Sequence, residues 1–200
     1  FGGMPGKKEG AVKLNNKTVT IKSPADAIKE GFAYVSEDRK RYGLVLGMDI
    51  AKNTTLIALN KVMKLNVISQ ALEVRVAEEI TTKMKLKAPN LDIEVGKLSG
   101  GNQQKVVLSK WIMNNPKLLI LDEPTRGIDV GAKYEIYKIM NELVQQGVGI
   151  VLISSELPEV LGMSDRILVM CEGEITGEFT REEATQEKVM MCATGGKKRD

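Results

Sequence analysis

Two stretches contain residue types whose spacing suits phosphate chemistry. The first is LSGGNQQ, Leu98–Gln104, which stands directly before a helical run. The free backbone N–H groups at a helix start attract anions, glycines allow close approach, and Ser99 adds a hydroxyl donor. Ser-Gly-Gly alone is more often a serine cap with flexible glycines, but the seven-residue string is far more specific. We therefore expect a phosphate-receiving loop at Ser99, Gly100, Gly101 and Asn102.

The second stretch, LLILDEP, ends an apolar run with the carboxylates Asp122 and Glu123. Ligands of open α/β sheets bind at the carboxyl ends of buried strands. An aspartate there can hold Mg²⁺ directly or through water, and the adjacent glutamate can orient or deprotonate an attacking water. The alternative is a pair of exposed carboxylates in a turn before Pro124. The buried-strand context favours the catalytic interpretation.

A complete nucleotide site also needs a P-loop, G-x-x-x-x-G-K-[ST], and the sequence has no match to it. Gly6-Lys7 is the nearest candidate, but Phe1 replaces the first glycine and Lys8 replaces the Ser or Thr. We interpret residues 1–10 as a glycine and proline turn, and we expect that the chain begins partway through a domain.

The elements that must position these residues alternate in type. The sequence predicts a hairpin over 11–21, a helix after Ser23-Pro24, a strand near 31–38 with Tyr34 in the core, and a helical insertion over 53–88. A helix over 106–115 then precedes a buried strand at 117–122, and a helix capped by Asp129 precedes a second buried strand at 148–153. This order indicates an α/β fold with a parallel sheet core, a small antiparallel β region and a helical subdomain.

The last quarter of the chain predicts a short helical connection and a second hairpin. The connection covers 154–163, and the hairpin covers 166–179 with its turn at Glu172-Gly173. Thr180 with Glu183 forms a capping box for the last helix. We expect Val107, Leu108 and Trp111 to pack inside the protein rather than to form a ligand platform.

Composition excludes several classes of function. The chain has 200 residues and a net charge of +3, with basic residues scattered apart from KKRD at its end, so it lacks the footprint of a nucleic-acid or membrane-surface binder. It has no histidine, which removes histidine bases and histidine metal ligands. Cys171 and Cys192 are too few for a disulfide framework or a zinc site, and a reducing cytoplasmic setting fits.

In order, LSGGNQQ, LLILDEPTRGIDVGAKYEIY and VLISSELPEVLGMSDRILVM resemble the signature motif, Walker B, D-loop and switch region of an ATP-binding cassette (ABC) protein. EDRKRYGLVLGM and TREEATQEKVM resemble the C-terminal cassette of bacterial monosaccharide importers of the ribose, galactose and xylose type, most like ribose importers. The resemblance implies a P-loop NTPase-like cassette, truncated before its P-loop. We divide it into a truncated core with the β region (1–47), the helical subdomain (48–97), the signature, Walker B and switch core (98–180), and a C-terminal helix and tail (181–200).

The resemblance implies a role in ATP binding and hydrolysis. Such cassettes bind ATP and Mg²⁺ between two halves, so LSGGNQQ would complete a site in trans for the N-terminal cassette of the same full-length chain. Glu123 would be the catalytic residue and Asp122 the metal ligand. The nucleotide contacts would come from Ser99, Gly100, Gly101, Asn102, Gln103, Asp129 and Ser155.

Two departures from the family pattern weaken the second site. Glu37 stands near the position of a family glutamine, and Ser155 stands where a histidine normally follows the strand after Walker B. Serine cannot supply an imidazole contact to a γ-phosphate. Glu37 and Asp38 are as readily interpreted as a solvated turn.

The resemblance also implies partners and a location. The partners would be integral membrane permease subunits and, indirectly, a periplasmic sugar-binding protein, with no nucleic acid. The chain would lie on the cytoplasmic face of the bacterial inner membrane, bound peripherally. Two alternatives stay open: a non-catalytic regulatory half-cassette, and a soluble twin-cassette protein acting on ribosomes or DNA.

Overall fold

The computed structural model describes residues 10–195, so the expected turn at Gly6-Lys7 and the basic tail lie outside the described residues. The chain divides into two compact units, Phe1–Val151 and Leu152–Asp200. No helix in the described part is long and apolar enough to cross a membrane.

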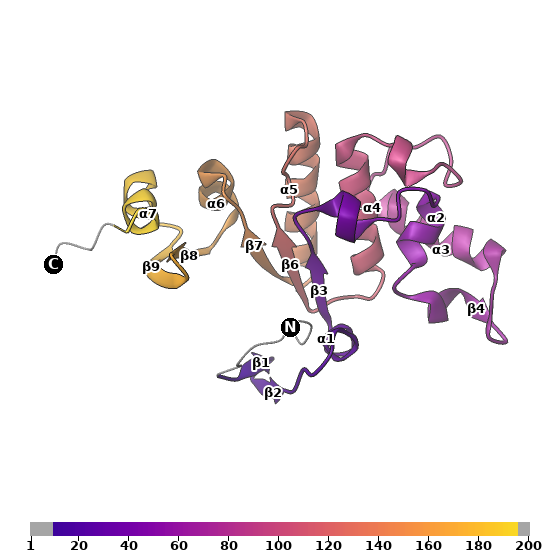
Figure 1. Cartoon of the computed structure of the whole chain (residues 1–200), viewed down its shortest axis with the longest axis horizontal. Coiled ribbons are helices and arrows are strands. Elements are labelled where there is room, and N and C mark those ends of the chain that lie inside the picture. The colour runs from indigo at the N-terminus through magenta and orange to yellow at the C-terminus, as the bar shows by residue number, and fades with distance from the viewer. Residues whose placement is uncertain (1–9, 196–200) are drawn as a thin grey trace. The chain divides into compact units, whose positions relative to one another are not determined.

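The first unit opens with a hairpin and a capped helix (Figure 1). Strands β1 (Val12–Leu14) and β2 (Lys17–Val19) pair antiparallel. Their turn residues Asn15 and Asn16 both have positive φ, 51° and 61°, which asparagine tolerates better than most residues. Helix α1 (Pro24–Glu30) begins at Ser23 with a complete capping box and ends at Gly31, which has a φ of 97°. The hairpin and α1 are therefore as predicted.

A three-stranded sheet forms the centre of the fold, in the order β3-β6-β7. Strands β3 (Phe32–Val35) and β6 (Leu118–Asp122) are parallel, with Tyr34 opposite Ile120. The side chains of Val35, Leu119 and Leu121 are completely buried. The parallel core expected from the sequence is confirmed.

Two long helices carry the residues of interest, and they lie beside the β3 and β6 pair in Figure 1. Helix α4 (Gly100–Ile112) begins at the N-cap Ser99 and contacts β3, and its Val107 and Leu108 are fully buried as expected. Helix α5 (Val130–Gln145) begins at the N-cap Asp129 and packs against α4. The first turn of α4 therefore follows directly after Ser99, and the first turn of α5 follows directly after Asp129.

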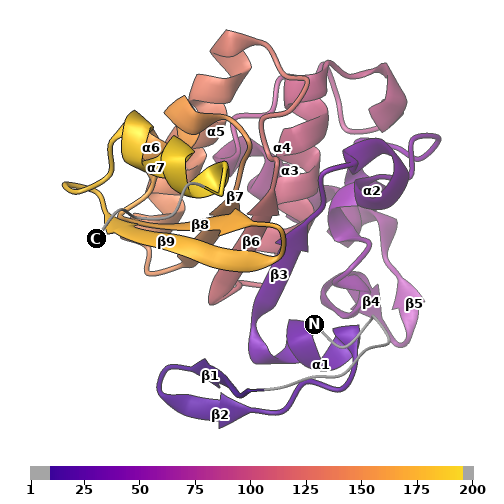
Figure 2. The same cartoon turned by 60° about the vertical axis from the view of Figure 1, so that its left-hand side comes forward.

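The insertion between β3 and α4 is only partly helical. It contains a π-helical turn (Arg39–Gly43), α2 (Ile50–Thr55), a 3₁₀ turn (Leu59–Val62) and α3 (Gln70–Lys83). Between the last two lies a hairpin of β4 (Met63–Lys64) and β5 (Val67–Ile68), visible in Figure 2. The helical insertion predicted over 53–88 therefore contains helices but is interrupted by this hairpin, because Leu65 and Asn66 take positive φ and reverse the chain.

The second unit contains α6 (Leu157–Met163), the antiparallel strands β8 (Arg166–Cys171) and β9 (Glu174–Thr180), and α7 (Gln186–Ala193). Figure 2 shows β8 and β9 as one long hairpin with α7 beside it. The turn falls at Glu172 and Gly173, both with positive φ, as predicted. The core of this unit consists of Ile167, Val169, Phe179, Val189 and Cys192.

Three local predictions are corrected. The last helix is capped by Thr185, which accepts a hydrogen bond from the Lys188 amide, while Thr180 and Glu183 close a separate turn before it. Strand β7 (Gly149–Ile153) is not buried: Val151 and Ile153, which share one face, are 44% and 46% exposed, and Ile150 and Leu152 on the other face are only half-buried. Tyr34 is 45% exposed and does not belong to the core.

Candidate functional site

The LSGGNQQ loop folds as the capped start of α4. Ser99 Oγ accepts hydrogen bonds from the backbone N of Asn102 at 3.4 Å and from Asn102 Nδ2 at 3.2 Å. Asn102 Oδ1 in turn accepts from the backbone N of Lys87 at 3.0 Å. The first-turn amides of a helix have no carbonyl partner within it, so the start of α4 presents donors and a positive dipole end.

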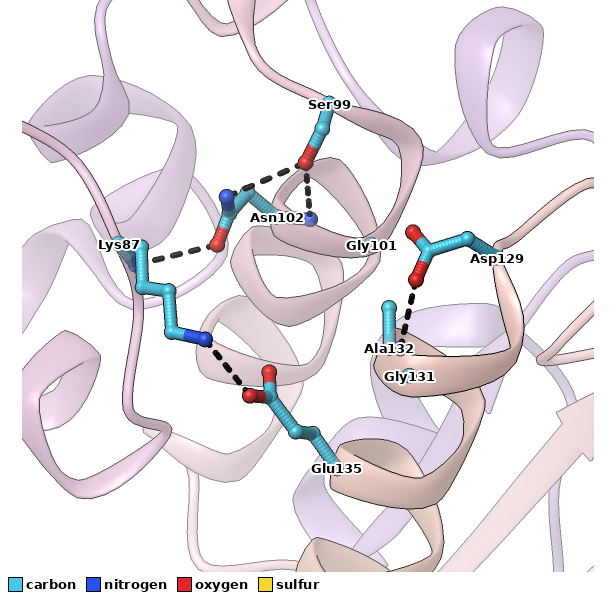
Figure 3. A pocket seen from close by; sticks show the side chains of 8 residues that line it. All are labelled: Lys87, Ser99, Gly101, Asn102, Asp129, Gly131, Ala132 and Glu135. Carbon is cyan, nitrogen blue, oxygen red and sulfur yellow. Dashed lines mark hydrogen bonds and ion pairs between the residues drawn. The ribbon is translucent and has the colours of Figure 1, made fainter.

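A second helix start faces the first. The D-loop, Gly127–Asp129, leads into α5, and Asp129 Oδ1 accepts from the backbone N of Ala132 at 2.9 Å. Figure 3 shows the two helix starts on opposite sides of a hollow. Its volume is about 250 Å³. This hollow is lined by Lys87, Ser99, Gly101, Asn102, Asp129, Gly131, Ala132 and Glu135. Four predicted site residues, Ser99, Gly101, Asn102 and Asp129, therefore share one pocket.

Glycine is required where these helices meet. A Cβ atom on Gly101 would lie 2.5 Å from the Cβ of Ala132, far inside any normal contact. A Cβ on Gly100 would lie 2.8 Å from Arg39 Nη2 and 3.2 Å from the Gly127 carbonyl oxygen. The two glycines of the loop thus permit close packing against the D-loop and α5, a purpose separate from contact with an anion.

The base of the pocket contains an ion network on Glu135. Its carboxylate accepts from Lys87 Nζ at 2.8 Å and from Lys105 Nζ at 2.6 Å, and Lys105 also donates to the Lys85 carbonyl at 2.7 Å. The hydrogen bond from Lys105, then that from Lys87, lower the pKa of Glu135 from 4.5 to about 2. Hydrogen bonding to the same carboxylate raises the pKa of Lys87. The Glu135 carboxylate is therefore ionised at neutral pH.

Asp122 and Glu123 lie at the carboxyl end of β6, as predicted. Tyr34 Oη donates to Asp122 Oδ2 at 2.8 Å, across from the neighbouring strand β3. Burial, the hydrogen bond to Asp122 and the charge of that carboxylate raise the pKa of Tyr34 to about 12. The next residue, Glu123, has a φ of 47°. This left-handed conformation is not that of a strand, and β6 ends before it.

The segment after β3 contacts the D-loop. Glu37 forms an ion pair with Arg126, and Arg39 donates from Nη1 to the Arg126 carbonyl at 2.9 Å. Asp38 Oδ1 accepts from the backbone N of Lys40 and of Arg41, which caps the π-helical turn. Glu37 and Asp38 therefore have specific partners, but both are exposed and belong to a turn, so the solvated-turn interpretation describes their surroundings.

Gln103 and Ser155 are not among the residues that line the pocket. Gln103 is buried, and its Nε2 donates to the carbonyls of Val95 and Leu98, so its side chain secures the start of α4 from inside. Ser155 belongs to the second unit, between β7 and α6. Ser155 therefore belongs to a different unit from Asp122 and Glu123.

The donors of this chain suit ATP and Mg²⁺ as shared ligands. The pocket offers two helix starts and the Ser99 hydroxyl to an anionic group. Among residues 10–195 no group of three or more acidic, cysteine or histidine side chains could hold a metal by itself. Mg²⁺ usually keeps several waters and takes phosphate oxygens together with one or two carboxylates, which a single Asp122 could supply.

Five residues of the site were not predicted from the sequence: Lys87, Gly131, Ala132, Glu135 and Arg39. Lys87 and Glu135 lie 48 positions apart, and nothing in the local pattern links them. Arg39 lies inside the EDRK segment, where the sequence pattern pointed only to its acidic neighbours. Ala132 could have been considered from the first turn of the helix that Asp129 caps.

The family model described as "ABC transporter" matches residues 2–126, more than half of the chain. This chain belongs to the ABC transporter family. Two of the curated relatives are the xylose import ATP-binding protein XylG of Geobacillus kaustophilus and the ribose import ATP-binding protein RbsA of Streptococcus agalactiae serotype III. They are 74% and 53% identical to it, and each match covers 98% of this chain. The chain spans about two fifths of their length, 39% and 40%.

Solved structures agree with the ABC fold. The ADP conformation of MJ1267, an ATP-binding cassette of an ABC transporter, matches with a TM-score of 0.73 at 28% identity, covering 94% of this chain and 77% of that one. A dimeric post-hydrolysis state of the cassette MJ0796, bound to ADP and phosphate, matches with a TM-score of 0.71 at 20% identity, covering 86% and 74%. The second likeness concerns the fold alone. The ABC cassette with a parallel core predicted from the sequence is thereby confirmed.

Proposed function

We propose that this chain is the C-terminal cassette of a monosaccharide-import ATPase, and that its LSGGNQQ loop completes an ATP site whose P-loop belongs to a partner cassette. The observation that carries the proposal is the pocket between the starts of α4 and α5, where Ser99, Gly101 and Asn102 gather without a P-loop motif in the sequence. Anion donors without the lysine of a P-loop suit half of a shared site.

Within that site each residue has a proposed role. Ser99, Gly100, Gly101 and the amide of Asn102 receive the γ-phosphate held by the partner. Gln103 acts from inside, since its buried amide holds the loop before α4. Asp129 keeps the D-loop in contact with the opposite cassette. ATP binding would then draw the two cassettes together, and hydrolysis would release them.

Asp122 and Glu123 belong to the second site of the pair. Asp122 holds Mg²⁺ and Glu123 orients or deprotonates the attacking water. When bound, Mg²⁺ supplies charge neutralisation at the phosphates. Ser155 replaces the histidine of the family pattern, and this favours slow hydrolysis at the second site.

The transported sugar is proposed as a pentose. Three relatives named xylose import ATP-binding proteins are 57% to 74% identical to the chain, and relatives named ribose import ATP-binding proteins are 52% to 53% identical. These identities favour xylose over the ribose first expected. The proposed partners are permease subunits at the cytoplasmic face of the inner membrane, with a sugar-binding protein acting through them.

The proposal is tested in the full-length twin-cassette protein with Ser99→Arg. The arginine would fill the phosphate position at the start of α4, so ATP-driven cassette closure should be lost while the fold is kept. Ser69→Arg is the matched control, because Ser69 is the N-cap of α3 and makes no side-chain cap bond. Closure is measured by fluorescence transfer between cassettes, and folding by circular dichroism. ATPase activity and sugar uptake at the wild-type level in Ser99→Arg would refute the role in trans.

One alternative has an observation in its favour. The serine at position 155 also suits a regulatory half that binds ATP without hydrolysing it. Glu123→Gln in the full-length protein separates the two possibilities. If Glu123 is the catalytic base of its site, the variant keeps closure and loses part of the turnover; if the half is regulatory, turnover stays unchanged.

A further inference from the structure

One arginine of the segment after β3, Arg39, contacts the D-loop and lies beside the start of α4. Arg39 Nη1 donates to the Arg126 carbonyl at 2.9 Å, and Nη2 donates to the Gly127 carbonyl at 3.5 Å. The same Nη2 atom lies where a Cβ on Gly100 would be only 2.8 Å away. Arg39 lies 61 positions before Gly100 and 88 before Gly127, so only the tertiary fold joins it to these segments.

The D-loop turn needs such a donor. Gly127 has a φ of 66°, and its carbonyl oxygen lies close to the backbone of Gly100. Two successive carbonyls at this place put partial negative charge beside a loop that has to receive an anion. A planar guanidinium has two donor branches that can satisfy both carbonyls at once, and its positive charge offsets theirs.

The stem of Arg39 is fixed as well as its tip. The side chain is half-buried, its Nε is enclosed without a hydrogen-bond partner in the described part of the chain, and its Cβ lies 3.4 Å from a Cβ built on Gly43. An arginine held in this way has little freedom to leave the D-loop. The ion pair of Glu37 with Arg126 is a second connection between the same two segments, but both side chains are exposed, so it contributes little alone.

We propose that Arg39 is a positioning residue of the shared ATP site. It fixes the Arg126–Gly127 turn against the start of α4, so that Asp129 and Gly101 remain on opposite sides of the pocket. Arg39 does not touch the nucleotide; it acts through the D-loop backbone. The consequence for ATP use rests on the proposed function, whereas the hold on the D-loop concerns this chain alone.

The experiment compares Arg39→Gln and Arg39→Lys with Arg41→Gln in the full-length protein. Arg41 is the matched control because it lies in the same π-helical turn, is exposed, and places its guanidinium over the Tyr42 ring at 5.2 Å, away from the D-loop. Lysine keeps the charge but lacks the forked donors, so Arg39→Lys should fall between wild type and Arg39→Gln. It also serves if the glutamine variant folds poorly.

The first readout is hydrogen exchange at the backbone amides of Ile128 and Ala132, which donate to the Thr125 carbonyl and to Asp129 Oδ1. Loss of hydrogen bonds from a charged donor should speed their exchange about tenfold in Arg39→Gln without a matching change at amides of β6. Equal exchange at Ile128 and Ala132 in Arg39→Gln and Arg41→Gln would overturn the proposal.

The second readout is ATPase kinetics. Arg39→Gln should raise the KM for ATP several-fold with a smaller change in kcat, because a displaced D-loop weakens closure more than chemistry. Faster exchange with unchanged KM would overturn the positioning role in ATP use. If the wild-type protein itself shows no ATP-driven closure, the proposed function fails, and the exchange readout alone then decides whether Arg39 holds the D-loop.

Discussion

Gly101 of the LSGGNQQ loop packs directly against Ala132 of α5, so closely that a methyl group on Gly101 would lie 2.5 Å from the alanine Cβ. This contact fixes the spacing of the two helix starts that line the pocket. The glycine is therefore required by its neighbour across the pocket as well as by any anion. That requirement can be tested independently of ATP.

Gly101→Ala should destabilise the protein, and Ala132→Gly should restore most of the loss. The added methyl overpacks the helix contact at a cost of about 1–3 kcal/mol, although alanine is the better helix former. In the double variant the methyl group gains space. Denaturant unfolding of the four proteins gives the coupling energy between the two positions.

Gly131→Ala is the control for this cycle, since its Cβ would lie 3.4 Å from Asp129 Oδ1, an ordinary contact. It should leave the free energy of unfolding nearly unchanged. Additive effects of Gly101→Ala and Ala132→Gly would show that the close contact is not what requires glycine at position 101.

Glu135→Ala should destabilise the fold through Lys105. Lys105 is only 1% exposed and would be left with a single carbonyl partner and an uncompensated charge. Breaking buried pairs costs about 3–5 kcal/mol, and we expect about 2–3 because Glu135 keeps a third of its surface in water. Glu142→Ala on the same helix removes an exposed pair with Lys85 and should cost about 0–1 kcal/mol. Similar losses in the two variants would contradict the buried network.

The Glu135 carboxylate should also make the free energy of unfolding depend on pH in the acidic range. The pKa of Glu135 is lowered from 4.5 to about 2 by its hydrogen bonds to Lys105 and Lys87. Because the pKa of Glu135 is lower in the folded than in the unfolded protein, its ionised carboxylate stabilises the fold above pH 4.5. This contribution is lost as the pH falls from 4.5 toward 2. The difference in unfolding free energy between wild type and Glu135→Gln should shrink over that range. A difference that does not vary with pH would exclude the charged network as its cause.

Asp122→Asn should lower the pKa of Tyr34 from about 12 toward its ordinary value of 10, but not fully, because burial is the largest cause of the shift. The pKa of the Tyr34 phenol is higher in the folded than in the unfolded protein. Its contribution to stability is therefore present below pH 10 and is lost as the pH rises through about 12. Ultraviolet titration of the tyrosines, with Tyr34→Phe to assign the signal, measures this. An unchanged Tyr34 titration in Asp122→Asn would mean that the hydrogen bond does not form in solution.

Features set by near neighbours in the sequence were predictable. The Asn15-Asn16 turn, the helix start at Ser23-Pro24 and the Asp129 cap all depend on residues within four positions of each other. The exception is Thr180 with Glu183, whose hydrogen bonds form but close a turn instead of starting the last helix. Short motifs therefore predicted local hydrogen bonds better than the element to which they belong.

Features made by distant residues could not be predicted. The expectation that Tyr34 lies in the core is wrong, and the partner of its hydroxyl, Asp122, lies 88 positions later in the chain. The pocket was predicted as separate motifs, and only the packing of α4 on α5 brings Ser99 and Asp129 together. Arg39 has the same distant character, with its carbonyl acceptors 87 and 88 positions away.

The isolated 200-residue chain should bind ATP weakly and show almost no ATPase activity. Its sequence contains Asp122, Glu123 and the LSGGNQQ loop but no P-loop lysine for the β- and γ-phosphates, so most of the binding energy for ATP is missing. Calorimetric titration with Mg²⁺ and ATP, alongside a phosphate-release assay, tests this after circular dichroism has established that the chain is folded. The matched comparison is the full-length protein at equal site concentration. Micromolar ATP affinity with steady turnover by the chain alone would show that its own residues form a complete site, and the role in trans would then lose its basis.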